Sequence, residues 1–247
     1  MGFFDFLKKE KTEDYPLPEL LVDMHSHLIP GIDDGAISIE DSISMIREFS
    51  ELGYKKLITT PHIMGDFYKN TPEIILSRLE KVKDRVNSEG IEIEIDAAAE
   101  YYLDEWFMKK VDEKDVLTFG NNYLLIETSY INEPSQLDEV LFQVKASGYQ
   151  PILAHPERYT YMYSNFQRYK DIYATGVLFQ LNLNSISGYY SKAAQDIAGK
   201  LIDNNMINFV GSDCHAMKHL TSMKKSRDTK TYRKLMQLDI LNNSLLA

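Results

Sequence analysis

The chain has 247 residues, a length typical of one large α/β domain, and 44% of them are apolar, which excludes a disordered chain. It carries 27 basic and 37 acidic residues, so its net charge of -10 offers no general footprint for nucleic acid or for an anionic membrane. The single cysteine excludes an internal disulfide framework and fits a reducing, cytoplasmic compartment.

The N-terminal residues differ in pattern from the rest. The apolar run within residues 1–19 is too short for a signal peptide, and charged residues interrupt it. We therefore interpret residues 1–19 as an N-terminal arm. Residues 20–247 are predicted to form one domain. Since no apolar run reaches membrane-spanning length, we expect no stable insertion into a membrane.

Strand-like and helix-like segments then alternate along the chain. The predicted strands, in chain order, cover residues 20–27, 55–60, 91–98, 123–128, 150–154, 177–183 and 207–211. The predicted helices cover residues 38–53, 71–90, 135–147, 164–174, 190–204 and 229–243. Two helix starts are marked by the capping box at Ser38-Ile39-Glu40-Asp41 and by Thr71-Pro72. The stretch 103–119 is predicted to be less regular.

This alternation implies a parallel α/β sheet. Seven strand–helix units in one domain favour a closed or nearly closed TIM-like barrel, and an open doubly wound sheet is the alternative.

The histidines are concentrated at one end of this predicted barrel. Five of the six lie at or just beyond the carboxyl ends of strands, and only His219 lies elsewhere; the five are His25, His27, His62, His155 and His215. Active sites of barrel enzymes lie at this face, so we expect these imidazoles to meet in one site.

Two of these histidines share the motif His25-Ser26-His27 at the end of the first strand. Side chains two residues apart in a strand point the same way, so both imidazoles can bind one metal ion. Asp213-Cys214-His215 is predicted to repeat this geometry after the seventh strand, with Cys214 turned away as a small buried apolar side chain.

Carboxylates complete the pattern. Glu100 and Glu127 follow apolar strands, and Asp33-Asp34 lie just after the first strand. Each of them alone would more often cap a helix or face water, but the joint pattern favours a metal site. Imidazole and carboxylate without thiolate suit Zn, Mn or Fe. The candidate ligands are too many for one ion and suggest two or three: His25, His27, Asp34, His62, Glu100, Glu127, His155, Asp213 and His215.

The charge of such a cluster favours an anionic substrate. Three divalent ions would bring about +6 against about -4 from four carboxylates, and multi-metal sites of this kind activate water and bind phosphoryl oxygens. The residues therefore predict a metal-dependent phosphoesterase.

The motifs resemble those of the PHP (polymerase and histidinol phosphatase) family. The matching stretches span almost the whole chain: residues 23–27, Thr60-Pro61-His62, Ala99-Glu100-Tyr101, Leu153-Ala154-His155-Pro156 and residues 211–215. Within the family, residues 27–35 and His155-Pro156-Glu157-Arg158-Tyr159 are most similar to the bacterial PHP-type protein-tyrosine phosphatases of capsule and exopolysaccharide operons.

This resemblance implies a distorted TIM-like (β/α)7 barrel and a set of roles. It assigns His25, His27, Glu100 and Asp213 to one ion. Glu100, Glu127 and His155 would hold a second ion, and Asp34, His62 and His215 a third. Manganese is expected before iron or zinc. A metal-bound hydroxide would attack phosphorus, and Arg158 would act as the catalytic residue that binds phosphate oxygens. Many members carry His at the Asp34 position, so the choice between Asp33 and Asp34 stays open.

The resemblance also implies a substrate and a location. It predicts a phosphotyrosine protein as partner, namely the tyrosine-rich tail of a bacterial tyrosine kinase that regulates polysaccharide synthesis, and no nucleic acid. The protein would be cytoplasmic, with peripheral contact to the inner membrane through that partner.

Other activities remain as alternatives. A histidinol-phosphate phosphatase or another small-molecule phosphoesterase of the same family is the nearest, followed by an amidohydrolase and by a metal-binding scaffold without turnover. A cysteine-nucleophile phosphatase is disfavoured, because Leu220 stands where that mechanism needs an arginine six residues after Cys214.

Overall fold

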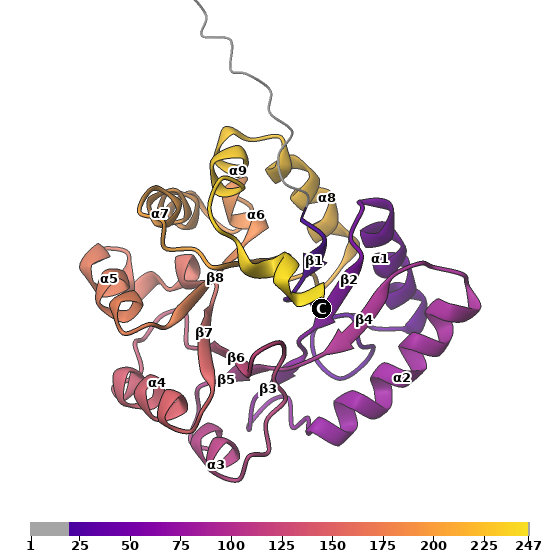
Figure 1. Cartoon of the computed structure of the whole chain (residues 1–247), viewed down its shortest axis with the longest axis horizontal. Coiled ribbons are helices and arrows are strands. Elements are labelled where there is room, and N and C mark those ends of the chain that lie inside the picture. The colour runs from indigo at the N-terminus through magenta and orange to yellow at the C-terminus, as the bar shows by residue number, and fades with distance from the viewer. Residues whose placement is uncertain (1–19, 247) are drawn as a thin grey trace, which may run out of the picture.

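The structure, a computed structural model, describes residues 20–246. The predicted arm over residues 1–19 lies outside the described residues, so the division into an arm and one domain over 20–247 stays a prediction. Figure 1 shows a ring of strands with helices around its outside. No helix among residues 20–246 is long and apolar enough to cross a membrane.

The strands are short and parallel. They are β1 (Val22–Asp23), β2 (Lys56–Thr59), β3 (His62–Ile63), β4 (Glu94–Ala97), β5 (Glu100–Tyr102), β6 (Tyr123–Glu127), β7 (Gln150–Ala154), β8 (Leu178–Asn182) and β9 (Phe209–Gly211). The helices are α1 (Ile39–Glu51), α2 (Pro72–Ser88), α3 (Phe107–Asp112), α4 (Leu137–Ala146), α5 (Phe166–Ala174), α6 (Leu183–Ile186), α7 (Lys192–Asp203), α8 (Met217–Arg227) and α9 (Lys230–Leu235).

Two of the predicted strands, over residues 55–60 and 91–98, are each followed by a second short strand that was not predicted. β2 continues as β3 after Thr60-Pro61, and β4 continues as β5 after Ala98-Ala99. The sheets therefore run β1-β2-β4 and β3-β5-β6-β7-β8-β9. Pro61 has no N–H to donate to a ladder, which interrupts the pairing at this point. Counting each broken strand once, residues 20–246 contain seven strand positions, as the sequence predicts.

Irregular contacts close the ring between β9 and β1. Near the carboxyl ends, Ser26 and Cys214 form an isolated parallel bridge, and the N–H of Asp213 donates to the carbonyl of His25 (2.8 Å). Near the amino ends, the Asn242 side chain donates to the carbonyls of Val22 (2.9 Å) and Val210 (2.7 Å). The fold is thus the distorted (β/α)7 barrel expected from the sequence.

The two marked helix starts are confirmed. The hydroxyl of Ser38 accepts from the N–H of Asp41, and the Asp41 carboxylate accepts from the N–H of Ser38, both at 3.1 Å. Thr71 caps α2, with Pro72 at its first position. Such caps satisfy N–H groups that have no partner within the helix.

Other expectations were wrong in detail. The local sequence pattern does not reveal α8, because the side that α8 buries includes Ser222 and Ser226 beside Leu220 and Met223, which weakens the apolar periodicity. Nor does it reveal α3, which lies in the stretch predicted to be irregular, or the single turn α6. The predicted helix over 229–243 is instead α9 followed by a 3₁₀ turn over Leu241–Leu246.

Apolar side chains fill two separate regions. The larger core lies between the strands and the helices, and the smaller one lies inside the barrel. The alternation along β6 separates them, because Leu124 and Ile126 belong to the outer core while Leu125 belongs to the inner one. The inner core is formed by Val22, Met24, Ile58, Ala98, Phe119, Leu125, Ile152, Ala154, Phe209 and Leu245.

Candidate metal centre

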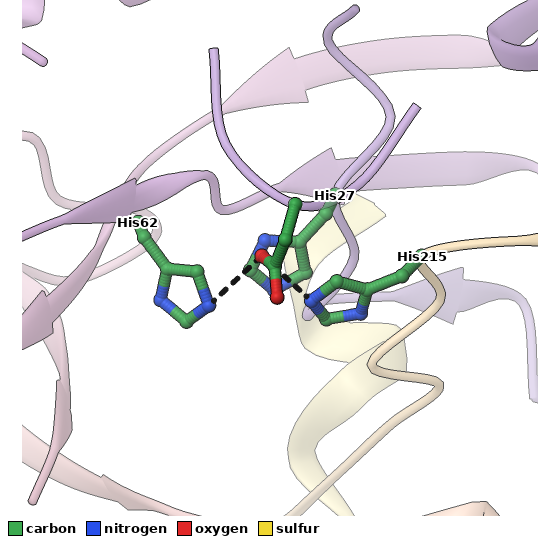
Figure 2. Close-up of side chains that lie close together, drawn as sticks. His27, His62 and His215 are labelled. Atoms are coloured by element: carbon green, nitrogen blue, oxygen red, sulfur yellow. Dashed lines mark ion pairs between the residues drawn. The ribbon is translucent and has the colours of Figure 1, made fainter. Parts of the chain in front are cut away.

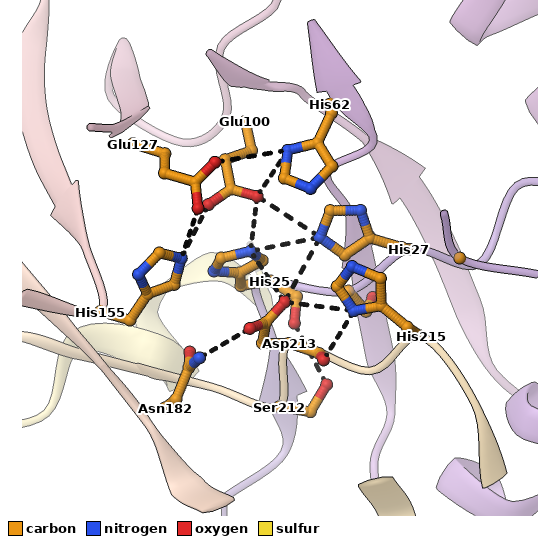
Figure 3. A network of polar contacts seen from close by, with 12 residues as sticks. His25, His27, His62, Glu100, Glu127, His155, Asn182, Ser212, Asp213 and His215 are labelled. Atoms are coloured by element: carbon orange, nitrogen blue, oxygen red, sulfur yellow. Dashed lines mark hydrogen bonds and ion pairs between the residues drawn. The ribbon is translucent and has the colours of Figure 1, made fainter. Parts of the chain in front are cut away.

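A cavity of about 910 Å³ opens at the carboxyl ends of the strands. Seven of the nine predicted ligands line it, with Arg158 beside them: Asp34, His62, Glu100, Glu127, His155, Asp213 and His215. His25 and His27 lie fully buried beneath them. The structure therefore brings all nine predicted ligands into one site. Figure 3 labels all of them except Asp34.

The first group surrounds the pair His25 and His27. The Nε2 atom of His25 lies 3.1 Å from Glu100 Oε2 and 3.6 Å from Asp213 Oδ1. The Nε2 atom of His27 lies 3.4 Å from Glu100 Oε2 and 3.5 Å from Asp213 Oδ1. Ligand bonds of about 2.0–2.2 Å in a tetrahedron place ligand atoms about 3.3–3.6 Å apart, so this spacing fits one ion.

The second group lies on the other side of Glu100. The Nε2 atom of His155 lies 3.0 Å from Glu100 Oε1 and 3.6 Å from Glu127 Oε1. Because Glu100 faces the first group with one oxygen and this group with the other, its carboxylate is placed to bridge two ions.

The third group combines Asp34, His62 and His215. Asp34 Oδ1 lies 3.5 Å from His62 Nε2 and 3.3 Å from His215 Nε2, and Figure 2 shows both rings with His27 behind them. His62 also reaches the second group, since its Nδ1 atom lies 3.7 Å from Glu127 Oε2. Its assignment to either group stays a prediction.

The adjacent aspartates have different surroundings. Asp33 Oδ2 accepts from His27 Nδ1 (2.8 Å) and from the N–H of His62 (3.1 Å), so Asp33 orients a histidine ring from behind. Asp34 is half-exposed and faces His62 and His215. These positions favour Asp34 as the ligand and Asp33 as the residue that orients His27.

Buried polar atoms test whether this site suits metal ions. Glu100 Oε2 is buried and makes no hydrogen bond, although nitrogens of His25, His27 and His62 lie within 3.4 Å of it. These donors and acceptors point toward shared centres rather than along hydrogen bonds. The residues therefore fit divalent cations, which would satisfy all of these lone pairs together.

The pKa values of His25 and His155 shift in opposite directions. Burial alone would lower the pKa of His25, but Glu100 and Asp213 raise it to about 9, so a cation bound there would displace a proton. Burial lowers the pKa of His155 to about 4, so its imidazole is neutral at pH 7, the form that binds a cation. Burial and the neighbouring Glu100 raise the pKa of Glu127 to about 8. A cation beside Glu127 would favour its charged form and lower this pKa.

The segment 213–215 reaches the site by a route that the sequence analysis did not anticipate. β9 ends at Gly211, and Asp213 has a φ of 49°, so the motif does not continue a strand. His155 has a φ of 32° and turns in the same way. Non-glycine residues rarely adopt this left-handed conformation, and such strain is concentrated at functional sites. Cys214 is fully buried, as predicted.

Arg158 borders the cavity between two aromatic rings. Its guanidinium carbon lies 4.5 Å from the Tyr130 ring centre and 4.2 Å from that of Tyr190. One of its N–H groups donates to Asp213 Oδ2 (2.8 Å). Burial opposes the charge on Arg158, but Asp213 outweighs burial and keeps the arginine pKa above its ordinary value. The guanidinium is thus held charged and fixed at the cavity wall.

Sequence reasoning missed the supporting residues on β8, a strand that carries no predicted ligand. Gln180 Oε1 accepts from His25 Nδ1 (2.8 Å) and from the N–H of His155 (3.3 Å). Asn182 donates to Asp213 Oδ2 (2.7 Å). The sequence signal that could have revealed them is a pair of amide side chains at alternate positions of an otherwise apolar strand.

Gly211 permits this close packing. A Cβ atom at position 211 would lie 2.6 Å from His25 Cβ and 2.8 Å from Gln180 Nε2, which no side chain could tolerate without a shift. Other missed supports are Tyr130, whose hydroxyl donates to Glu127 (2.5 Å), and His219, whose Nδ1 accepts from the N–H of His215 (3.0 Å).

Comparison with known proteins places this site in a family. The family model for CpsB/CapC, described as capsular polysaccharide synthesis, matches residues 21–241. The chain belongs to the CpsB/CapC family. The match covers every predicted ligand and Arg158.

Relatives of this CpsB/CapC chain include named phosphatases. The tyrosine-protein phosphatase YwqE of Bacillus subtilis is 28% identical over 199 residues, which cover 80% of this chain and 78% of YwqE. The tyrosine-protein phosphatase CpsB of Streptococcus agalactiae is 27% identical over 201 residues, which cover 79% of this chain and 83% of CpsB.

Solved structures agree on the architecture. One from a study of YwqE from Bacillus subtilis and CpsB from Streptococcus pneumoniae, described as unique metal-dependent tyrosine phosphatases, has a TM-score of 0.82 and 26% identity, covering 91% of this chain and 94% of that chain. The lactonase Lmo2620 from Listeria monocytogenes has a TM-score of 0.55 at 12% identity, over 92% of this chain and 95% of that chain, and shares the fold alone.

Proposed function

We propose that this CpsB/CapC chain is a metal-dependent protein-tyrosine phosphatase that acts in the synthesis of capsular or exopolysaccharide. The observation that carries the proposal is the convergence of nine imidazole and carboxylate side chains, with Glu100 between two of their groups, in one cavity of a chain from this family.

The nine residues would hold two or three divalent ions, manganese before iron or zinc. When bound, such ions supply a water activated at neutral pH and positive charge for the phosphate oxygens. Glu100 keeps two ligand groups together, while Asp33, Gln180 and Asn182 hold ligand side chains in place.

Arg158 is proposed to bind the phosphate. Its fork of donors suits phosphate oxygens, and Tyr130 and Tyr190 hold the guanidinium plane from both sides. Because one N–H group already binds Asp213, Arg158 also ties the phosphate position to a ligand of the first group.

The proposed substrate is phosphotyrosine on a protein, namely the tyrosine-rich tail of a bacterial tyrosine kinase. Support comes from the likeness to tyrosine-protein phosphatases and from a cavity wide enough for an aryl phosphate. We propose a cytoplasmic location, with the inner membrane approached through the kinase.

The test is turnover after metal exchange. The purified protein is stripped of metal, reloaded with manganese, iron or zinc, and assayed on a phosphotyrosine peptide, histidinol phosphate and an amide substrate. We expect the phosphotyrosine peptide to be hydrolysed fastest, and only after reloading. Preference for histidinol phosphate, amide hydrolysis, or metal binding without any turnover would each reject the proposal.

A further inference from the structure

A second cavity adjoins the metal centre. It has a volume of about 400 Å³ and lies between the residues that connect β3 to α2 and the beginning of α3. We call it the Trp106 cleft; its walls include Gly65, Tyr68, Lys69 and Trp106. A volume of this size accommodates a few side chains of a bound ligand.

Trp106 is held firmly although 49% of it is exposed. A Cβ atom at Gly65 would lie 2.3 Å from Trp106 Cδ1, so only glycine allows the indole to lie against this backbone. The Asp104 carboxylate accepts from the N–H of Gly65 (2.8 Å) and from the N–H of Trp106 (2.9 Å). The backbone on both sides of this contact is therefore fixed, and the indole packs against Gly65, which lowers the entropy that ligand binding costs.

Tyr68 connects the cleft to the metal centre. This side chain lines both cavities, and its ring stacks on the ring of His62 with centroids 5.5 Å apart and planes 13° apart. The two cavities therefore meet at Tyr68, so a polypeptide whose phosphate lies among the ligands would pass close to the Trp106 cleft.

The cleft combines an apolar wall with Lys69, a cation that has no ion-pair partner in the part of the chain that the structure describes. Lys109 and Lys110 pair with Glu113 (3.8 Å) and Asp115 (3.2 Å), whereas Lys69 has no such partner among residues 20–246. Phe67, 73% exposed, belongs to the same connection. Apolar contact and a free ammonium group suit a polypeptide that carries apolar and acidic residues.

We propose that the Trp106 cleft binds the residues beside the phosphotyrosine of a polypeptide substrate, with an apolar side chain against Trp106 and an acidic group near Lys69. This proposal rests on the proposed phosphatase function and adds a determinant of substrate choice. Trp and Tyr are the residue types that most often dominate binding at protein interfaces.

Kinetics with two peptides and a small substrate test it. Both peptides carry phosphotyrosine and an aspartate; one has leucine on each side of the phosphotyrosine and the other has serine. The small substrate, p-nitrophenyl phosphate, has no neighbouring residues to place in the cleft. For the wild type we expect at least a fivefold higher kcat/KM on the leucine peptide, and Trp106→Ala should abolish that preference while changing turnover of p-nitrophenyl phosphate less than twofold.

Two phenylalanines give a matched control. Phe67 and Phe142 are 73% and 71% exposed. Phe67 stands between Asp66 and Tyr68, which line the Trp106 cleft, whereas Phe142 lies on α4 and does not line it. Phe67→Ala should weaken the preference for the leucine peptide, whereas Phe142→Ala should leave it unchanged. Equal losses on the peptides and on p-nitrophenyl phosphate, or an unaltered preference in Trp106→Ala, would overturn the proposal.

Fluorescence gives a readout that does not depend on turnover, because Trp106 is the single tryptophan of the chain. The metal-loaded protein is titrated with the leucine peptide containing a non-hydrolysable phosphonate analogue of phosphotyrosine. We expect the Trp106 emission to change with the peptide and not with the phosphonate amino acid alone. An unchanged emission at saturating peptide, or a change that follows self-association of the protein, would refute peptide binding in the Trp106 cleft. Absence of phosphatase activity in the loaded wild type would instead refute the proposed function.

Discussion

The two ends of the barrel interior are built on the same strands but are lined by opposite chemistry. Near the amino ends the interior holds Val22, Ile58, Leu125, Ile152 and Phe209, all buried and apolar. Near the carboxyl ends, the next residues of the same chain segments are histidines and carboxylates. Along β6 the side chains that face the interior change from apolar to charged between Leu125 and Glu127, which are two residues apart.

This difference separates stability from chemistry. Burial of apolar side chains at the amino end stabilises the barrel, at about 25 cal/mol per Å² of apolar surface. At the carboxyl end, buried imidazoles and carboxylates cost desolvation energy, which cations would offset. Substitutions at the amino end should therefore change the free energy of unfolding, and substitutions at the carboxyl end should change turnover and metal content.

The largest effect is expected from removing a proposed ligand. His27→Ala or Asp213→Ala should lower kcat by about a thousandfold or more, because metal-ion catalysis supplies several kcal/mol of transition-state stabilisation. Metal content measured by elemental analysis should fall with it, while the far-UV circular dichroism stays unchanged. Full turnover in either variant would contradict the ligand assignment.

Arg158→Ala should produce a smaller loss. Removing one charged hydrogen-bonding group costs about 1.5–3 kcal/mol, so we expect kcat/KM to fall about tenfold to a hundredfold with metal content largely intact. Arg168 provides the matched control, since it pairs with Glu133 and Asp138 on the outside of the barrel. If metal content collapsed in Arg158→Ala but not in Arg168→Ala, the phosphate-binding role would be wrong.

Gln180→Ala should act through metal affinity. Its amide orients His25, and loss of a supporting partner of a metal ligand typically lowers affinity by about tenfold or more. The apparent metal dissociation constant, measured by titrating activity with free metal, should rise, while kcat at saturating metal changes little. Gln143 lies on the exposed face of α4, so Gln143→Ala should change neither the metal dissociation constant nor kcat. A fall in kcat that excess metal does not restore would show that Gln180 acts otherwise.

The smallest effect is expected at the apolar end. Ile152→Val removes one buried methylene and should lower the free energy of unfolding by about 0.5–1.5 kcal/mol, as measured by urea denaturation. Metal content and kcat should match those of the wild type. A change in metal affinity would mean that the two ends of the barrel are energetically coupled.

Sequence patterns predicted most of the architecture because their signals are local. The alternating segments, the capping box at Ser38 and the Thr71-Pro72 start depend on neighbouring residues alone. α8 was missed because tertiary packing buries Ser222 and Ser226, which no local periodicity reveals. The interruptions of the ladders after β2 and β4 could not be predicted for a similar reason, because pairing with adjacent strands decides where each ladder ends.

The candidate site divides in the same way. The types of its ligands and their positions after strands could be read directly, because residues that follow parallel strands meet at one face of a barrel. Which aspartate faces the cavity, which amide of β8 orients His25, and how Asp213 and His155 turn inward depend on contacts between segments far apart in the chain. Those contacts exist only once the barrel has closed. Local patterns therefore specify the types of the candidate ligands, and the folded chain specifies their geometry.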